Sequence, residues 1–390
     1  MSRGDSSDGG RPREGWGKSP DSGAGSEPFR VRPARRPLGA RSTPRPPTMR
    51  DIAEASGVSQ STVSRVLTGT STVVPINELT RQKVIETARR MRYRPNPLAR
   101  GLRGSRTNLV GVIVREITDP FFAGAVDAVS SEASRRGYNV VLGHAHGRTE
   151  EALAVRAVLE TRHCDAIIVL GDTSDQPRLL EDLRQANVHM VGMWQGSGTV
   201  PGLHTVAVDN AAGINSLMDH LLELGHKRFG FISGGFSEGR LLGDIGERRT
   251  AFIERLAAER LGIAPGFLRE SPNTMKGGAE AFEALMTQPV RPTAVLASTD
   301  VLAIGALHAA YRLGIPVPGE ISIVGFDDLP MAAFTNPPLT TVRMPTAEMA
   351  TVGVRVAIDS IDERNAPPLQ VLEPLIVLRE SSGPPPSSAR

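Results

Sequence analysis

The sequence predicts an α/β protein with two doubly wound parallel lobes, preceded by a small helical unit. The first observation is that short apolar runs alternate with amphipathic stretches from residue 109 onward, which is typical of parallel sheets covered by helices. The second is length, because about 270 residues of this pattern are more than a single hydrophobic core usually holds. Two similar lobes that face a cleft are therefore expected. The third is a compact helical periodicity over residues 48–94.

The predicted elements of the lobes follow this alternation. Strands are expected at 109–114, 139–143, 165–170, 189–193, 228–232, 293–297 and 321–325. Helices are expected near 122–136, 150–160, 211–223, 247–260, 276–286 and 300–312. The two lobes together are expected to span residues 106–379, and the Ser- and Pro-rich residues 380–390 are expected to form a disordered tail.

Composition excludes several classes of protein. With 39% apolar and 22% charged residues among 390, the chain is globular and neither fibrous nor fully disordered. No apolar run approaches the roughly 20 residues that span a bilayer, and the arginine-rich start lacks a hydrophobic leader, so a cytoplasmic protein without a membrane partner is expected. The single cysteine, Cys164, forms no internal disulfide or cysteine cluster, and His144 and His146 lack a third ligand. Neither a metal nor a cofactor is expected.

The net charge of +3 conceals an uneven distribution. Residues 1–47 hold ten Lys or Arg against five Asp or Glu, and residues 48–104 hold ten against four. The first 104 residues therefore carry +11, which leaves −8 on the remaining 286. A basic front end on an acidic body suggests a nucleic-acid-binding head joined to a body with another role, with a merely solvated basic surface as the alternative.

Residues 1–47 are predicted to form a disordered basic tail. They contain eight Gly, eight Pro and seven Ser, and their apolar residues show no period. The arginines of this tail would add non-specific attraction to phosphates. The alternative is a tail without function or a start codon assigned too far upstream, since Met49 lies where a shorter product would begin.

Residues 48–94 are predicted to contain a helix-turn-helix. Thr48 followed by Asp51 is a capping-box-like start for a first helix. Gly57 permits the left-handed backbone of a tight turn, and Ser59 is a good N-cap for a second helix. The residues expected to face the core are Ile52, Ala53, Ala55, Val58, Val63, Val66 and Leu67, with Val84, Ile85 and Ala88 from a third helix over about 80–91. An ordinary helical hairpin is the alternative.

Several strings of residues carry a resemblance to a known family. The head and hinge strings are MRDIAEASGVSQSTVSRVL at 49–67 and YRPNPLARGLRG at 93–104. The body strings are GVIVREITDPFF (111–122), VDNAAG (208–213), LGHKRFGFISG (224–234), STDVLAIGAL (298–307), GIPVPGEISIVGFDDLP (314–330) and TNPPLTTVRMP (335–345). Together they resemble the lactose/galactose repressor (LacI/GalR) family of bacterial transcription regulators, over residues 48 to about 379. The resemblance implies a helix-turn-helix head and a two-lobed effector domain with the fold of periplasmic binding proteins.

The resemblance implies which residues of the head contact DNA. Gln60 and Ser61 match positions that read the major groove, and Arg65, one turn later, has a side chain suited to a bidentate bond to guanine. Thr62, Ser64 and Asn96 would hold phosphates. The whole set predicted to bind DNA is Thr48, Ser59, Gln60, Ser61, Thr62, Ser64, Arg65, Asn96, Ala99, Leu102 and Arg103.

Residues 95–105 match the hinge helix of the family. In the family this helix orders only on operator DNA and inserts a leucine into the minor groove at the symmetry centre, and Leu102 matches that leucine. Such a wedge makes recognition depend on DNA deformability as well as on contacts. Because two hinge helices must meet, the implied assembly is a homodimer on pseudo-palindromic double-stranded operator DNA, with a tetramer left open.

Ligands of doubly wound sheets bind beyond the carboxyl ends of the strands, and the loops there match the effector site of the family. The predicted effector-binding residues are Asp119, Phe121, Phe122, Trp194, Arg248, Asn273 and Asp300. A carboxylate and a guanidinium opposed across aromatic faces suit a small polyhydroxylated molecule, so a sugar or sugar derivative is expected. Taken singly, these residues also fit a core or a helix surface, and it is their matched positions that favour binding.

Two departures from the family bear on these assignments. The segment TGTSTVVPINEL at 68–79 makes the connection between the second and third helices about three residues longer than usual, which a surface loop tolerates but which shifts any phosphate contacts made there. Trp194 stands where many sugar-responsive members have an aspartate. A hydroxyl-binding carboxylate is lost and a stacking surface is gained, so a different sugar, an aromatic or nucleoside-like effector, or no effector all fit.

Two other functional classes are less consistent with the sequence. An enzyme is disfavoured because the chain lacks a phosphate-binding G-x-x-x-x-G-K-[ST] loop, a G-x-S-x-G elbow and an H-E-x-x-H motif. A soluble sugar-binding protein of the periplasmic type remains the alternative, against which the attached head and the missing leader argue. The sequence therefore predicts a ligand-responsive transcriptional repressor in which effector binding changes the angle between the lobes and so the packing of the hinge helices.

Overall fold

The computed structural model describes residues 45, 47–68, 75–93, 106–144, 164–171, 181, 185, 188–196, 202–235 and 243–387. The chain divides into two compact units, Met1–Pro95 and Asn96–Arg390. The described part of the first unit is helical, and the second contains two parallel sheets with helices, which confirms the predicted fold class. The predicted helix at 150–160, the hinge and nearly all of residues 1–47 lie outside the described residues.

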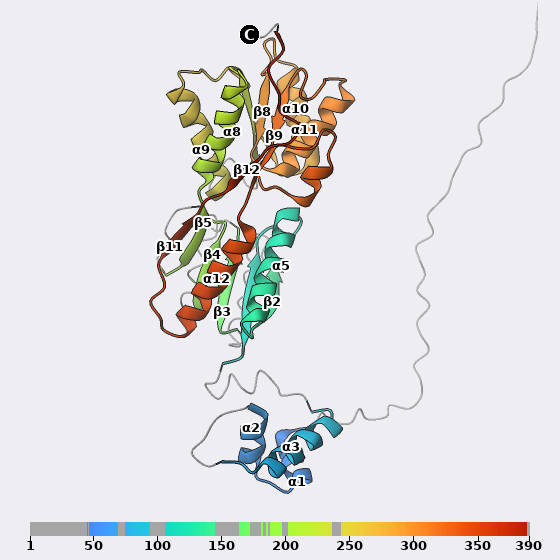
Figure 1. Cartoon of the computed structure of the whole chain (residues 1–390), viewed down its shortest axis with the longest axis vertical. Helices are drawn as coiled ribbons and strands as arrows, with labels where there is room; N and C mark the ends of the chain where they lie inside the picture. The colour runs from blue at the N-terminus through green and yellow to red at the C-terminus, as the bar shows by residue number, and fades with distance from the viewer. Residues whose placement is uncertain are drawn as a thin grey trace, which may run out of the picture. The chain divides into compact units, whose positions relative to one another are not determined.

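The head is built from α1 (Met49–Ser56), α2 (Gln60–Thr68) and α3 (Glu78–Arg90) (Figure 1). Each helix contributes one fully buried side chain to a common core, namely Ile52, Val63 and Val84. The capping box is formed, because the Asp51 amide donates to Thr48 Oγ1 and the Thr48 amide donates to Asp51 Oδ2 at 2.6 Å. Gly57 ends α1 with a left-handed φ of 67°, as expected for a helix-turn-helix.

The predicted core of the head is wrong at one position. Ala55 is exposed, and Ser56 is buried in its place, with its hydroxyl donating to the Ile52 carbonyl at 2.5 Å. With 3.6 residues per turn, positions 52, 53 and 56 share one face of α1, whereas position 55 lies outside it.

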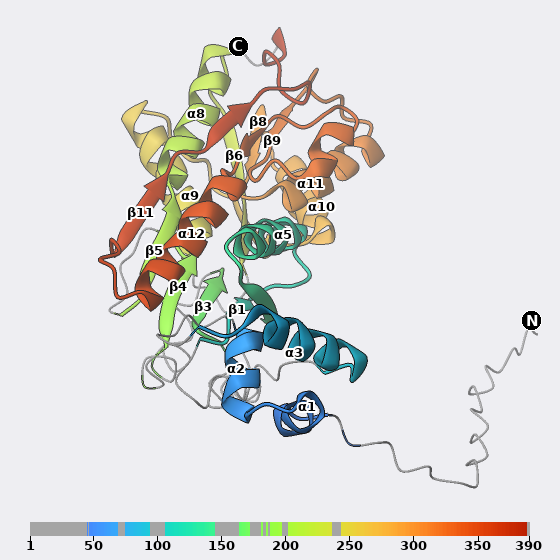
Figure 2. The ribbon, with the colours of Figure 1, turned by 60° about the horizontal axis from the view of Figure 1, so that its bottom comes forward.

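The first lobe contains a six-stranded sheet in the order β11-β5-β4-β3-β1-β2, with all neighbouring strands parallel. Its strands are β1 (Leu109–Val114), β2 (Asn139–His144), β3 (Ala166–Leu170), β4 (His189–Met193), β5 (His204–Val208) and β11 (Leu369–Leu372). The helices α5 (Pro120–Arg135) and α12 (Thr346–Ile361) pack side by side, and α12 also contacts β3, β4 and β5 (Figure 2). Continuous burial of β3 agrees with its unbroken apolar run.

The second lobe contains a four-stranded parallel sheet in the order β7-β6-β8-β9. Its elements are α8 (Asn210–Glu223), β6 (Phe229–Gly235), α9 (Gly243–Ala258), β7 (Leu268–Pro272), α10 (Met275–Met286), β8 (Ala294–Ala297), α11 (Asp300–Arg312) and β9 (Ser322–Val324). Figure 1 shows α8 and α9 on one side of this sheet and α10 and α11 on the other. Successive side chains of β6 point to opposite faces of this sheet. Phe231 packs on Phe252 of α9 on one face, and Ile232 belongs to the hydrophobic core on the other face.

The chain crosses between the lobes three times. It passes from β5 into α8, returns from β10 (Thr341–Arg343) into α12, and leaves again from β11 into β12 (Leu375–Val377). The last two crossings are joined by the antiparallel pairing of β10 with β12. Because each lobe takes segments from distant parts of the chain, neither lobe is a continuous stretch of sequence.

Several elements are absent from the sequence prediction, and each lacks the expected pattern. The edge strands β7 and β11 are short and partly exposed, with charged or polar residues among their apolar ones. The helix α12 is rich in valine, threonine and isoleucine, which have low helix propensity, and packing against the first sheet determines its conformation. The short elements β5, β10, β12 and the 3-10 helix η1 (Pro330–Phe334) are also additional to the prediction.

The predicted disorder of residues 380–390 is wrong for residues 380–387. Ser381 is fully buried, and its hydroxyl accepts from the Thr340 amide at 2.8 Å. The buried imidazole of His226 contacts the Gly383 carbonyl at 2.8 Å. Composition predicts a loose tail because these polar groups find their partners only on the edge of the folded second lobe.

None of the described helices combines the length and apolarity that crossing a membrane requires.

Two glycines on facing helices allow α10 and α11 to pack closely. A Cβ at Gly305 of α11 would collide with the backbone carbonyl of Met275, and one at Gly278 of α10 with that of Leu302. We expect Gly305→Ala to lower the free energy of unfolding by about 1–3 kcal/mol, because the helices must separate. Urea denaturation measures this change.

The matched control is Gly124→Ala in α5, where a new Cβ would meet nothing within 4 Å. There the substitution should be neutral or stabilising by up to about 1 kcal/mol, because alanine favours the helix. Equal effects of the two substitutions would contradict close packing of α10 on α11.

Candidate functional site

The start of α2 presents a capped and exposed first turn. Ser59 Oγ accepts from the Thr62 amide at 3.1 Å and lies 2.7 Å from the Ser61 hydroxyl. This cap confirms the predicted N-terminus of α2 and leaves the side chains of Gln60 and Ser61 exposed. A rigid helix start with exposed polar side chains is the geometry that reads base edges in a major groove.

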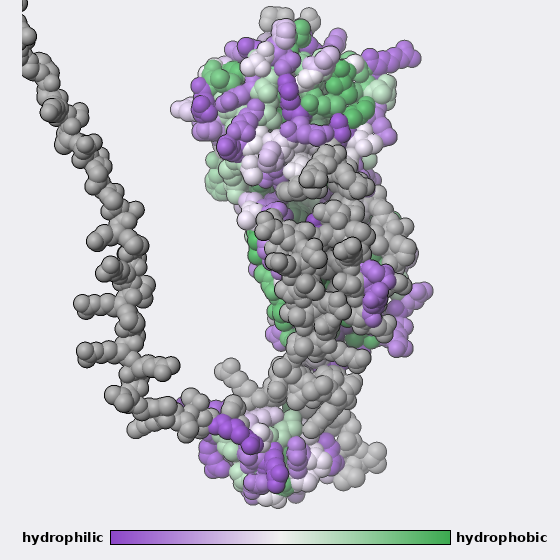
Figure 3. All heavy atoms as spheres, turned by 180° about the vertical axis from the view of Figure 1, so that it is seen from behind, coloured by the Kyte–Doolittle hydropathy of each residue, from purple (hydrophilic) through white to green (hydrophobic). Residues whose placement is uncertain are grey.

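The other polar residues of the head are partly exposed. Arg65 lies one turn after Ser61 and donates from Nε to its carbonyl at 3.3 Å. Hydrophilic side chains predominate over the described part of the head (Figure 3). Thr48, Thr62 and Ser64 are half-buried, and Thr48 is already used as the cap of α1. The predicted DNA contacts Asn96, Ala99, Leu102 and Arg103, and residues 69–74 of the longer loop, lie outside the described residues.

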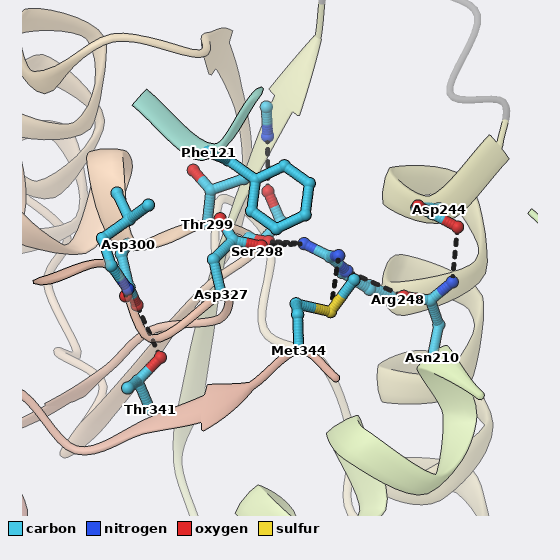
Figure 4. A network of polar contacts seen from close by, with 12 residues as sticks. Phe121, Asn210, Asp244, Arg248, Ser298, Thr299, Asp300, Asp327, Thr341 and Met344 are labelled. Atoms are coloured by element: carbon cyan, nitrogen blue, oxygen red, sulfur yellow. Dashed lines mark hydrogen bonds and ion pairs between the residues drawn. The ribbon is translucent and has the colours of Figure 1, made fainter. Parts of the chain in front are cut away.

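In the body, Arg248 of α9 is buried at the carboxyl end of the second sheet, with 3% of its surface exposed. Its Nε donates to Asn210 Oδ1 at 2.9 Å and its Nη1 to the Ser298 carbonyl at 2.7 Å (Figure 4). The guanidinium carbon lies 3.8 Å from the centroid of the Phe326 ring, a cation–π contact. These contacts hold the guanidinium in one orientation.

The counter-charge of Arg248 is Asp327, which follows β9. Its Oδ1 lies 3.3 Å from Arg248 Nη1, and both side chains are almost fully buried. Burial raises the pKa of Asp327 well above its usual value, and the neighbouring guanidinium only partly opposes this shift. Asp327 also adopts a positive φ of 124°, uncommon for a non-glycine residue, which indicates that the surrounding structure holds it in place.

A partly buried polar chain connects Arg248 to the first lobe. Asn210, at the start of α8, donates from Nδ2 to Asp244 Oδ1 at 2.9 Å and to Glu247 Oε2 at 2.8 Å. The same Asp244 oxygen accepts from the Gly196 amide at 3.0 Å, in the loop that follows β4. Burial raises the pKa of Asp244, against the effect of Arg248. The guanidinium is therefore linked to a loop of the opposite lobe.

A second polar chain joins the lobes through Asp119, the N-cap of α5. Its Oδ1 accepts from the Phe121 amide at 2.9 Å, and its Oδ2 accepts from Asn273 Nδ2 at 2.9 Å. The other end of the Asn273 amide accepts from Thr299 Oγ1 at 2.6 Å. Burial raises the pKa of Asp119. Two loops of the second lobe thus meet the first helix of the first lobe.

Three aromatic rings line this region of the first lobe. Phe121 contacts Phe122 edge to face at 5.4 Å between centroids, and contacts Trp194 edge to face at 5.3 Å. Phe121 and Phe122 are half-buried, whereas Trp194 is 2% exposed. The structure therefore brings these three predicted residues together beside Asp119.

Asp300, which is also predicted to bind the effector, is bonded within the second lobe. It has no exposed surface, and its two oxygens accept from Thr341 Oγ1 at 2.5 Å and from the Leu329 amide at 2.7 Å. These bonds fasten β10 and the loop after β9 to the start of α11. Asp327, in that same loop, is the carboxylate that faces Arg248.

Sequence reasoning also missed Asn210 and Asp244. Asn210 lies inside the VDNAAG string, and Asp327, which the sequence analysis also did not select, lies inside GFDDLP. Both residues therefore stand in strings that resemble the family, and that position is the signal that could have identified them. Asp244 lies in no such string, and its role depends on the fold of α9.

Among the described residues no group of three His, Cys, Asp or Glu could hold a metal ion. Burial raises the pKa of the Cys164 thiol to about 11, which makes it unreactive.

Comparisons with known proteins identify the family. The family model for "Bacterial regulatory proteins, lacI family" matches residues 48–96, and the model for "Periplasmic binding protein-like domain" matches residues 218–382. The HTH-type transcriptional regulator GalS of Salmonella typhimurium is 32% identical over 313 residues, which are 80% of this chain and 89% of that protein. The chain belongs to the lacI family of bacterial regulatory proteins. It is accordingly a DNA-binding transcriptional regulator.

Other similar proteins agree with membership of the lacI family. The HTH-type transcriptional repressor CytR of Escherichia coli is 31% identical over 315 residues, covering 80% of this chain and 89% of CytR. Among solved structures, a complex of the regulator CelR with cellobiose matches with a TM-score of 0.64 and 28% identity, over 86% of this chain and 99% of CelR. A lac repressor dimer bound to operator and the anti-inducer ONPF shares the fold, with a TM-score of 0.76 and 24% identity over 87% and 100% of the two chains.

The burial of Asp300 predicts a pH dependence of stability. Burial raises the pKa of Asp300 to about 6 from 3.8, so the folded state binds its proton more tightly than the unfolded state. The protonated Asp300 carboxyl therefore contributes to the free energy of unfolding in full below about pH 4, and this contribution is lost as the pH rises through about 6. In Asp300→Asn, the amide can still accept from Leu329 and donate to Thr341, so this dependence should disappear.

Urea denaturation at several pH values between 4 and 7.5 measures the effect. Relative to Asp300→Asn, the wild type should lose about 2 kcal/mol of unfolding free energy across this interval. The control Asp219→Asn, at a half-exposed position, should keep the wild-type profile. Parallel profiles for the wild type and Asp300→Asn would contradict the assignment.

Proposed function

We propose that this regulator is a repressor that binds a pseudo-palindromic operator as a homodimer, under the control of a small, neutral, sugar-like effector. The observation that carries the proposal is the buried Arg248 network at the carboxyl ends of the strands, in the same chain as an exposed, capped α2. The first is built to hold a polar ligand and the second to read DNA.

The DNA-binding part of the proposal rests on α2. Gln60 and Ser61 would read base edges, and Arg65, Thr62 and Ser64 would contact bases or phosphates near the same groove. The positive charge of residues 48–104 supports attraction to the phosphate backbone. A dimer, with Leu102 as its minor-groove wedge, is supported by the shared fold of the lac repressor, which binds its operator as a dimer.

The effector part of the proposal rests on charge and polarity at the Arg248 site. Three carboxyl groups, on Asp119, Asp244 and Asp327, lie close enough to interact with the single guanidinium of Arg248, so the site offers no excess of positive charge to an anionic ligand. Carboxyl and amide groups that exchange hydrogen bonds suit the hydroxyls of a neutral polyol. The CelR structure with cellobiose supports a sugar-like ligand. Asp327, beside Arg248, would be a further carboxyl group that accepts from such a ligand.

Coupling between the two sites would pass through the polar chains that join the lobes. The bonds from Asn273 to Asp119 and from Gly196 to Asp244 connect loops on opposite lobes. An effector that replaces or strengthens either bond changes the preferred angle between the lobes, and with it the packing of the hinge. The proposal includes no catalytic activity and places the protein in the cytoplasm, since its relatives GalS and CytR are transcriptional regulators.

The DNA-binding proposal predicts that one pseudo-palindrome emerges when purified protein selects from a random duplex library at near-physiological salt. Gln60→Ala should weaken binding to that sequence by about tenfold, because one base contact is worth about 1–3 kcal/mol. Leu102→Ala should weaken it too. The charge control Arg312→Ala, on the exposed end of α11, should bind like the wild type. Binding that depends on salt alone and not on sequence would contradict the proposal.

The effector proposal predicts different outcomes for two adjacent arginines. Arg248→Lys keeps the charge but loses the forked donors that hold Asn210, Ser298 and Asp327, so the operator should still be bound while its response to effector is lost. Arg249→Lys, at a neighbour that forms a long ion pair of 3.6 Å with Glu270, should respond normally. Electrophoretic mobility shifts with and without effector distinguish the two, and a normal response in Arg248→Lys would refute the site.

A further inference from the structure

The first described residue after the predicted hinge, Arg106, is held by the end of a helix. Its Nη2 donates to Asp362 Oδ1, and the same guanidinium donates to the hydroxyl of Tyr138, the residue before β2. Asp362 is the C-cap of α12, and its backbone amide donates to the carbonyls of Ile358 and Ser360. The chain that follows the hinge is therefore attached to α12 through one side chain.

The two residues after Arg106 are fixed as well. The amide and the hydroxyl of Thr107 both donate to Asp165 Oδ1 at 2.8 Å, and the Asn108 amide donates to Asp165 Oδ2 at 2.8 Å. Asp165 lies immediately before β3. A carboxylate that accepts three hydrogen bonds from two consecutive residues leaves their backbone little freedom. The hinge therefore joins a fixed point of the first lobe, and Arg106 is the side chain at that point.

The position of Asp362 is unfavourable for its own helix. The last carbonyl groups of an α-helix carry a partial negative charge, which disfavours a carboxylate at the C-terminal end. The last turn of α12 contains no basic residue. Two cations from outside the helix compensate the charge, because Asp362 Oδ1 meets Arg106 and Oδ2 lies 2.9 Å from Arg364 Nη2. A residue that local preference disfavours is expected where a tertiary contact or a function requires it.

The opposite end of α12 lies at the Arg248 network. Two residues before the helix, Met344 accepts at its sulfur from Arg248 Nη2 at 3.8 Å (Figure 4), and its amide donates to the Asp327 carbonyl at 3.5 Å. Between the two ends, Gly353 packs on β4, where an added Cβ would lie only 2.5 Å from Met193 Sδ. The 16 residues of α12 span about 24 Å. One helix therefore runs from the candidate effector site to the residue that follows the hinge.

We propose that Asp362 is a positioning residue for operator binding, which fixes the start of the first lobe against α12 through Arg106 and so holds the hinge in place to dock on DNA. The proposal rests on the proposed function. Fixing the chain beforehand lowers the entropy lost when the hinge orders on the operator. Because α12 starts at the Arg248 network, a change in how it meets the second lobe would move Arg106 and alter operator affinity.

The test compares two carboxylates about one turn apart on α12. Asp362→Asn removes the charge that holds Arg106, whereas the control Asp359→Asn removes a carboxylate that lies 3.0 Å from Arg364 Nη1. Loss of a negative charge by itself would leave DNA binding unchanged or strengthen it. We expect Asp362→Asn instead to weaken binding to the selected operator about fivefold, the scale of a partly exposed ion pair, with no change for a random duplex of equal length. Asp359→Asn should bind both duplexes like the wild type.

A double-mutant cycle shows whether Asp362 acts through the hinge. In protein that already carries Leu102→Ala, adding Asp362→Asn should weaken operator binding by no more than about 1.5-fold, because both substitutions remove the same hinge-dependent free energy. Asp362→Glu keeps a carboxylate and should bind the operator more tightly than Asp362→Asn. Urea denaturation verifies that each variant is folded, since a partly exposed ion pair contributes little to the free energy of unfolding.

Three outcomes would overturn the proposal while the wild type still selects an operator. They are wild-type operator affinity in Asp362→Asn, equal weakening for the operator and the random duplex, and an effect of Asp362→Asn that is as large with Leu102→Ala as without it. The second is the result that a loss of folded protein alone would give. If the wild type selects no operator at all, the DNA-binding part of the proposed function fails, and this proposal fails with it.

Discussion

The structure of the effector domain depends on one buried charge, the guanidinium of Arg248. A buried cation is costly unless it is paired and hydrogen-bonded, and here the side chain of Asn210, the carbonyl of Ser298 and the carboxylate of Asp327 supply those partners. Each partner lies just beyond a strand or at the first turn of a helix, from β5 to β9. Satisfying one side chain therefore requires several loops of the domain to be correctly placed at once.

The same network explains why the two lobes are not independent. A carboxyl bonded to a loop of the other lobe occurs twice, as Asp244 with Gly196 and as Asp119 with Asn273. Both carboxyls have a pKa raised by burial, so their charged forms are not stabilised by solvent and depend on the donors across the gap. Under the proposed function, the hydroxyls of an effector would compete for these same donors and acceptors, and binding would then shift the preferred arrangement of the lobes.

Much of the fold was predictable because local pattern and tertiary environment agree. The strand at Leu109–Val114 is apolar throughout and is buried on both faces, and Gly57 is the residue that a left-handed helix end favours. Where the two disagree, prediction failed. The helix Thr346–Ile361 is rich in β-branched residues and is stabilised by packing on the first sheet, and Ser381 is held by partners on a strand edge that composition does not reveal.

For the candidate site, the sequence by itself determined the residue types and the loops that carry them. Strand-end positions and matched motifs singled out Asp119, Phe121 and Arg248, which the structure places in the two polar chains that join the lobes. Only the tertiary structure decided which carboxyl faces Arg248. Asp300 and Asp327 are both acidic residues just after a strand, but one is used up by Thr341 and Leu329 while the other meets the guanidinium. Hydrogen-bond partners far apart in the chain set that difference, and they exist only once the loops have met.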